Sequence, residues 1–105
     1  MKDEYQIPEF KDKLEEKIWY RMVDVVVGRV GVDPEEITLS SDYVNDLGAD
    51  SLEREELIMG LECEFDIDIP DEDAEAMKTV QDTFKYLKRR KRELKIDTEE
   101  NYKNE

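Results

Sequence analysis

Ser51 is the side chain whose position and chemistry together indicate a functional site. It follows Gly48 and Ala49, which are typical of the end of a loop, and it precedes an amphipathic segment. Asp50 is a suitable N-cap for that segment, and Glu53 stands at the third helical position, where its carboxylate can complete a capping box. We therefore predict that the Ser51 hydroxyl lies in the first turn of a helix.

A serine hydroxyl acts as a catalytic nucleophile when a neighbouring base accepts its proton. The sequence contains no histidine, and no lysine lies near Ser51 along the chain. This argues against a self-contained hydrolase, and we predict that the chain is not an enzyme. Two interpretations of Ser51 remain open at this point, namely a hydroxyl that another enzyme modifies and a serine that only begins a helix.

Metal and thiol chemistry have weaker support. Cys63 is the only cysteine, and neither a second cysteine nor a histidine is present to share a metal ion with it. The carboxylates between Asp66 and Asp73 are dense, but Pro70 stands near the point where an EF-hand calcium loop needs its turn glycine. We predict no metal site, and weak binding of divalent cations to the cluster stays open.

The charge distribution narrows the classes of partner. The 105 residues are enough for one domain, and 16 basic residues stand against 30 acidic ones. From Asp33 to Glu75 there are seventeen acidic residues against the single Arg54, a net charge of −16. This excludes a generic nucleic-acid binder, which needs clustered Lys and Arg, and it predicts basic partners. We expect no membrane insertion, since no apolar run is long enough, and the lone cysteine fits the reducing cytoplasm.

The segment that positions Ser51, residues 51–65, has two different faces at helical periodicity. One is a broad apolar stripe that predicts a core-facing side, made of Leu57, Ile58, Leu61 and Phe65. The opposite face combines apolar and acidic side chains, namely Leu52, Met59 and Cys63 with Glu55 and Glu56 between them. This second face is either a surface for partners or an ordinary surface with a few exposed apolar residues.

Three further helices are predicted around this segment. Apolar residues at steps of three and four favour a helix from Lys11 to about Val30, ended by Gly31. Residues 71–77 predict a short helix, and Thr79 begins the last one with Asp82 as its capping-box partner. The last helix turns Val80, Phe84 and Leu87 inward, and Leu94 could extend this stripe.

The connections complete an all-α fold, a small four-helix bundle with a long loop between the first and second helices and a short third helix. The long loop covers residues 32–50, and we expect it to be held on the core by Ile37, Leu39, Tyr43, Val44 and Leu47. Residues 66–70 form a connector that buries Ile67 or Ile69. Residues 88–92 form a basic helix end, and residues 97–105 should be disordered.

Two blocks of sequence carry a family resemblance. The run LGADSLE, residues 47–53, is followed at a fixed spacing by EFDIDIPDEDAE, residues 64–75. Together they resemble the acyl carrier proteins of type II fatty-acid synthesis. The resemblance runs from about Ile18 to Leu87. It divides the chain into an N-terminal extension and lead-in to the first helix (residues 1–17), a carrier domain (18–87), and a basic helix end with a C-terminal tail (88–105).

The resemblance implies a function for the site. In this family the serine that matches Ser51 receives a 4′-phosphopantetheine arm from coenzyme A through a phosphopantetheinyl transferase, and Asp50 stands beside it. The thiol of that arm holds an acyl chain as a thioester. The implied partners are fatty-acid synthase enzymes with basic docking patches, bound by Leu52, Glu53, Glu55, Glu56 and Met59. The implied shelter for the acyl chain is a pocket formed by Tyr43, Val44, Leu61, Ala74 and Met77.

One departure from the family pattern leaves alternatives open. Glu55 stands where these carriers usually have a valine on the partner-facing side of the helix. We therefore keep a specialised carrier for polyketide or aminoacyl cargo, and an unmodified acidic interaction module of the same fold, beside a fatty-acid carrier. We expect a monomer in each case.

Overall fold

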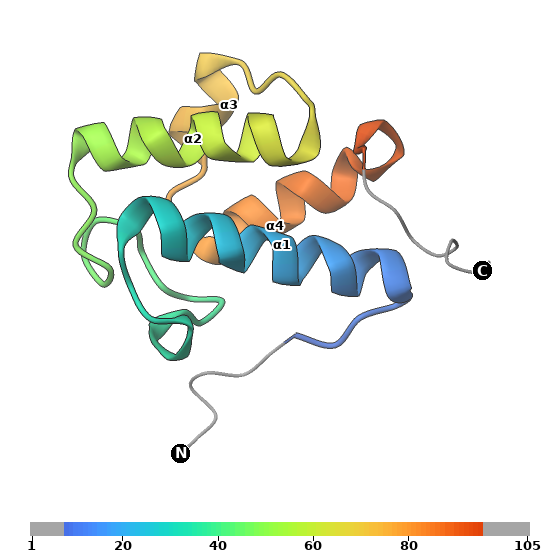
Figure 1. The fold of residues 1–105 in the computed structure, drawn as a ribbon, viewed down its shortest axis with the longest axis horizontal. Coiled ribbons are helices and arrows are strands. Elements are labelled where there is room, and N and C mark those ends of the chain that lie inside the picture. Colours follow the sequence, from blue (N-terminus) through green and yellow to red (C-terminus); the bar gives the residue numbers. More distant parts are fainter. Residues whose placement is uncertain (1–7, 96–105) are drawn as a thin grey trace.

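The computed structural model describes residues 8–95, and this part of the chain contains four α-helices and no β-strand (Figure 1). The α-helices are α1 (Lys13–Val30), α2 (Ser51–Phe65), α3 (Asp71–Ala76) and α4 (Val80–Arg89). Two short 3-10 helices, η2 (Pro34–Glu36) and η3 (Lys91–Glu93), follow α1 and α4. The predicted all-α fold with a long first loop and a short third helix is confirmed. The predictions for residues 1–7 and 97–105 lie outside the described residues.

Helix α1 begins two residues later than predicted because Asp12 caps it. The Asp12 carboxylate accepts the N–H of Glu15 at 2.9 Å, and Gly31 ends the helix in the left-handed conformation with φ 82°. Helices α1 and α2 lie side by side and antiparallel (Figure 1). Gly60 lies at their contact, where a Cβ would stand 2.9 Å from Val25 Cγ1.

The core is built from the inward faces of α1, α2 and α4. Trp19 of α1 and Phe84 of α4 meet edge to face, with ring centroids 5.2 Å apart. The predicted core stripe of α2 is largely as expected, since Leu57, Leu61 and Phe65 are buried and Ile58 is half-buried. Burial of such side chains supplies most of the stability of a domain of this size.

The long loop, residues 31–50, lies on the core through Ile37, Tyr43 and Leu47, which are all buried. Its backbone is also tied to the start of α4, because the N–H of Tyr43 donates to the carbonyl of Lys78 and that of Val80 to Ser41, both at 3.0 Å. The prediction that Val44 packs on the core is wrong. Val44 lies in a turn in which the Asp42 carboxylate accepts its N–H, and its side chain is 49% exposed.

The connector between α2 and α3 buries both Ile67 and Ile69. The Glu62 carboxylate reaches from α2 and accepts the N–H of Ile69 at 2.8 Å, which fixes the course of residues 66–70. Residues 94 and 95 pack back on this region. Leu94 is buried, and the N–H of Lys95 donates to the carbonyl of Phe65 at 3.1 Å.

Arg90 closes the same end of the molecule. Its guanidinium donates to the carbonyl of Asp68 and to the hydroxyl of Tyr86, both at 2.6 Å, and that hydroxyl donates to Asp73 of α3 at 2.9 Å. These contacts join α3, α4 and the connector. The packed part of the chain therefore extends past the predicted domain limit at residue 87.

Candidate functional site

Ser51 is the first residue of α2, and its side chain is exposed. The predicted capping box is present. Glu53 N–H donates to the Asp50 carboxylate at 2.8 Å, and Asp50 N–H donates to the Glu53 carboxylate at 3.1 Å. Because Ser51 follows this cap directly, its hydroxyl is held at the positive end of the helix dipole and open to solvent.

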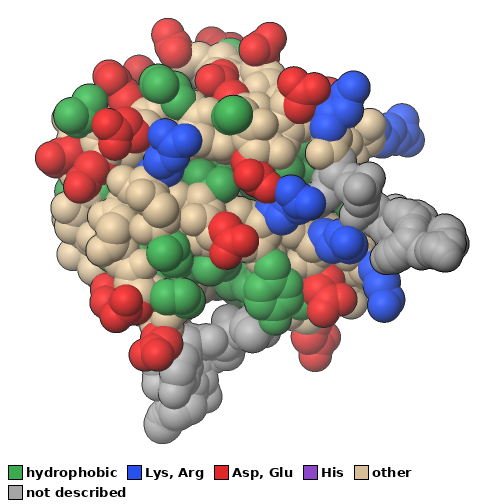
Figure 2. Space-filling model, in the orientation of Figure 1, with side chains coloured by type: hydrophobic (Ala, Val, Ile, Leu, Met, Phe, Trp, Pro, Cys, Tyr) green, Lys and Arg blue, Asp and Glu red, His purple; other side chains and the backbone are tan. Residues whose placement is uncertain are grey.

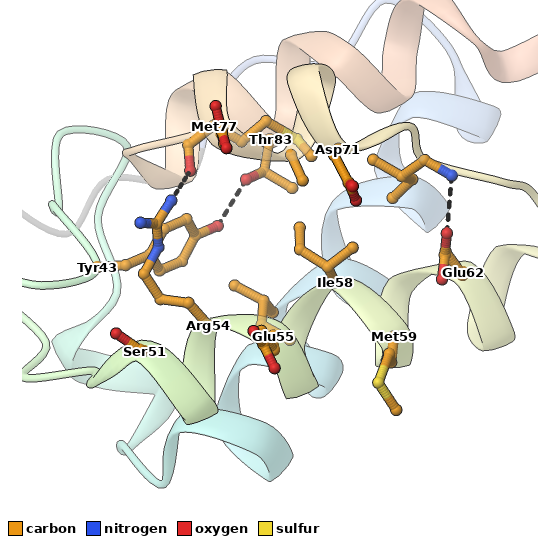
Figure 3. A pocket seen from close by; sticks show the side chains of 14 residues that line it. Tyr43, Ser51, Arg54, Glu55, Ile58, Met59, Glu62, Asp71, Met77 and Thr83 are labelled. Atoms are coloured by element: carbon orange, nitrogen blue, oxygen red, sulfur yellow. Dashed lines mark hydrogen bonds between the residues drawn. The ribbon is translucent and has the colours of Figure 1, made fainter.

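An open cavity of about 530 Å³ begins beside Ser51 and runs between α2 and α3 (Figure 3). Apolar side chains form its inner walls, and acidic side chains surround its opening. The lining consists of Tyr43, Ser51, Arg54, Glu55, Leu57, Ile58, Met59, Glu62, Ile69, Asp71, Ala74, Glu75, Met77 and Thr83. Ile58 points from α2 toward α3 in Figure 3, whereas Met59 points away.

A buried hydroxyl pair forms one end of the cavity. The hydroxyl of Tyr43 lies 2.7 Å from Oγ1 of Thr83, and both side chains are almost completely buried. Because Oγ1 of Thr83 donates its own proton to the carbonyl of Thr79, Tyr43 is the donor in this pair. Burial raises the pKa of Tyr43 well above its ordinary value, so this hydroxyl is protonated at neutral pH.

Arg54 reaches across the opening of the cavity. It starts from the first turn of α2, and Nη2 donates to the carbonyl of Met77, the C-cap of α3, at 3.3 Å (Figure 3). This bond connects α2 to the end of α3. It also places a positive charge close to Ser51 and Tyr43 on the cavity wall.

The outer face of α2 combines exposed apolar and acidic side chains. Leu52 is 62% and Met59 58% exposed, while Glu55 and Cys63 are also exposed. Figure 2 shows acidic side chains gathered at the end of the molecule where α2 begins, and Lys and Arg toward the end where α1 begins. Such a face is suited to a partner that brings cations and a small apolar contact.

Comparison with known proteins identifies the family. A family model described as a phosphopantetheine attachment site matches residues 21–87. The acyl carrier protein of Syntrophobacter fumaroxidans is 52% identical over 71 residues, which are 68% of this chain and 88% of the relative. That of Bdellovibrio bacteriovorus is 49% identical over 70 residues, 67% of this chain and 90% of the relative. The chain belongs to the acyl carrier proteins. The Clostridium acetobutylicum member is 45% identical over 71 residues, 68% of this chain and 92% of the relative.

Family membership confirms three predictions for this acyl carrier protein. It is a carrier and not an enzyme, and its prosthetic group is 4′-phosphopantetheine. It follows that acyl chains and the enzymes that load or use them are its partners in general.

Within residues 8–95 no helix has the length and apolar content needed to cross a membrane. In the same range no group of three or more acidic or cysteine side chains is arranged to hold a metal ion.

The structure separates the residues predicted for the acyl pocket. Tyr43, Ala74 and Met77 line the cavity beside Ser51. Val44 and Leu61 are not part of that lining. Val44 points into solvent from its turn, whereas Leu61 is fully buried on the side of α2 that packs into the core.

Several cavity residues were not predicted from the sequence. Thr83 comes from α4, which is distant from Ser51 in the chain, Ile69 comes from the connector after α2, and Ile58 was assigned only to the core. Arg54 carried a usable signal, since it is the single cation among seventeen acidic residues. Nothing in the sequence, however, indicates toward which neighbour so long a side chain turns.

Proposed function

We propose that Ser51 carries the 4′-phosphopantetheine arm and that this chain presents acyl thioesters to enzymes of fatty-acid synthesis. The observation that carries the proposal is the position of one exposed hydroxyl. Ser51 is the first residue of a capped helix, and it also belongs to the lining of the cavity between α2 and α3. A group attached there has access to solvent, to the outer face of α2 and to the cavity.

The residues around Ser51 suit the phosphodiester of the arm. The capping box uses the N–H groups of Asp50 and Glu53, while those of Ser51 and Leu52 have no acceptor within the helix. An anion at a helix N-terminus gains from such free donors and from the helix dipole. Arg54 lies one helical turn further on and adds a positive charge on the same side.

The cavity gives the acyl chain a shelter from water. The prosthetic group, when bound, supplies a thiol that holds the acyl chain as a thioester. Leu57, Ile58, Ile69, Ala74 and Met77 offer apolar walls within reach of Ser51. Each methylene that moves from water into such surroundings contributes about 0.8 kcal/mol, so the cavity stabilises loaded chains until it is full.

The outer face of α2 is the proposed docking surface for partner enzymes. Leu52 and Met59 provide the apolar contact, and Glu53, Glu55 and Glu56 provide the charge. We expect basic patches on the phosphopantetheinyl transferase and on the synthase enzymes to meet this face. The exposed thiol of Cys63 favours a reducing compartment, and the proposal includes the cytoplasm.

A specialised carrier for polyketide or aminoacyl cargo is the second candidate, and Glu55 favours it. Its exposed carboxylate stands on the proposed docking face and must be matched by a cation when a partner covers it. A partner without such a cation would bind this chain poorly.

Intact mass spectrometry tests the attachment site. Incubation of the apo-protein with coenzyme A and a broad-specificity phosphopantetheinyl transferase should add one arm. Ser51→Ala should add none, and Ser40→Ala, which removes another exposed serine hydroxyl, should add one. An arm on Ser51→Ala, or no arm on the unchanged chain, would refute the proposal. Elongation of the loaded protein by fatty-acid synthase enzymes then tests the pathway.

A further inference from the structure

Arg54 has an unexpected set of contacts for the single cation of a strongly acidic region. From residue 33 to 75 it is surrounded in sequence by seventeen carboxylates. The ion pairs found within 4.0 Å among residues 8–95 nevertheless do not include it. Its guanidinium instead donates to the Met77 carbonyl and lines the cavity (Figure 3). Charge neutralisation alone therefore does not account for its position.

The hydrogen-bond donors of Arg54 at this end of the cavity are only partly used. A guanidinium has five N–H donors, and the bond to Met77 uses one of them. The Tyr43 hydroxyl donates to Thr83, and because both side chains are 1% exposed this pair is closed to a cargo molecule. The cavity beside Ser51 thus offers several donors from Arg54 next to its apolar walls.

A plain alkyl chain would use none of these groups. It would also displace water from the guanidinium and leave polar groups without partners, which disfavours binding. A chain with an oxygen atom would replace that water by hydrogen bonds. A carboxylate is less suitable than a neutral oxygen, because Glu55, Asp71 and Glu75 surround the opening and would repel it.

We propose that Arg54 makes the cavity selective for acyl chains with a neutral oxygen substituent, a keto or hydroxyl group close to the thioester. The Arg54 fork donates to that oxygen. This inference rests on the proposed function, because the cargo must be attached at Ser51 to reach the cavity. Arg54 acts here as a specificity-determining residue and has no part in forming the thioester.

The test compares three cargoes of equal chain length on the holo-protein, namely hexanoyl, 3-oxohexanoyl and 3-hydroxyhexanoyl. Intact mass first confirms complete loading, and thermal unfolding then gives the Tm of each form. The variants are Arg54→Met, which keeps the length of the side chain without its donors, and Arg54→Lys, which keeps the charge without the planar fork. Arg21→Met, which removes one cation on α1 away from the cavity, is the matched control.

The oxygenated cargoes should raise the Tm above that of the hexanoyl form by about 4 °C or more, the change expected for one net hydrogen bond in a domain of this size. Arg54→Met should abolish this difference, Arg54→Lys should reduce it, and Arg21→Met should leave it unchanged. In NMR spectra of the unchanged protein, the Arg54 Nε–H signal, identified by its loss in Arg54→Met, should shift with the oxygenated cargoes only. Because each difference is taken within one variant, a general loss of stability does not affect it.

Equal Tm values for hexanoyl and oxygenated cargoes on fully loaded protein would overturn the inference. So would a difference that persists in Arg54→Met. Failure of the proposed function appears earlier and differently, as absence of the added mass on Ser51, and it would overturn both proposals.

Discussion

The hydrogen bond between Tyr43 and Thr83 permits a quantitative test of how the long loop is held on α4. The two residues are separated by 40 positions in the chain, their oxygens lie 2.7 Å apart, and both are 1% exposed. Tyr43→Phe removes the donor and leaves an unfilled acceptor on Thr83. Thr83→Val removes the acceptor and leaves the buried Tyr43 hydroxyl without its partner.

The two substitutions should therefore differ in cost. Loss of one net hydrogen bond in Tyr43→Phe should lower the free energy of unfolding by about 1 kcal/mol. Thr83→Val should cost about 1–3 kcal/mol, because a buried donor is left unsatisfied. In the double variant two apolar groups of similar shape meet, so its cost should be well below the sum of the single costs.

Urea unfolding of the apo-protein at pH 7 measures the cycle. A coupling energy above about 0.5 kcal/mol is expected for residues in direct contact. Additive costs, or a Thr83→Val variant no less stable than Tyr43→Phe, would refute the assignment of Tyr43 as a buried donor.

The pH dependence of the same pair has a definite sign. Burial raises the pKa of Tyr43 in the folded state above its ordinary value of 10.0. The folded state thus favours the protonated hydroxyl. The contribution of Tyr43 to the free energy of unfolding is therefore complete below about pH 10, and it is lost as the pH rises further. Stability should fall above pH 10, and Tyr43→Phe should flatten that decline. Burial also raises the pKa of Tyr86. The pH dependence of stability in Tyr43→Phe is therefore compared with that in Tyr86→Phe.

Three further predictions concern packing, charge and docking. Gly28→Ala, where a Cβ meets nothing within 4 Å, should raise stability by about 0.5–1 kcal/mol, and Gly60→Ala should gain less because its Cβ would lie 2.9 Å from Val25 Cγ1. Equal gains in urea unfolding would contradict the tight contact. The Tm should rise as salt increases from about 0.01 M to 0.15 M, since the screening length falls from about 30 Å to 8 Å, and a constant Tm would show that the acidic charges are already compensated. Glu55→Val should raise kcat/KM several-fold with a generic ketosynthase and weaken binding of the native partner. Glu35→Val, which removes an exposed carboxylate on η2, should change neither quantity. No change in Glu55→Val would leave the specialised-carrier hypothesis without support.

The features that follow from local chemistry were predictable from the sequence. The capping box of Asp50 and Glu53 depends on a spacing of three residues, and so does that of Thr79 and Asp82. The burial of the α2 stripe follows from helical periodicity. These features fix the direction of α2 and the place of Ser51 at its start.

Features that depend on distant contacts were not predictable. Val44 directly follows a buried residue in the long loop, and only the turn set by the Asp42 carboxylate turns its side chain outward. The pairing of Tyr43 with Thr83 and the direction of Arg54 depend on how α2, α3 and α4 meet. A long side chain has many rotamers, and the tertiary environment selects among them.

The contacts made by Arg90, Leu94 and Lys95 determine where this carrier domain can be cut for insertion into a chimeric synthase. The family model matches residues 21–87. A module cut at residue 87 would lose the guanidinium that holds the Asp68 carbonyl and the N–H that covers the carbonyl of Phe65 at the end of α2. It would also expose the surface that Leu94 covers. The smallest transferable unit of this chain therefore ends after Lys95, and a linker to the next domain belongs beyond it.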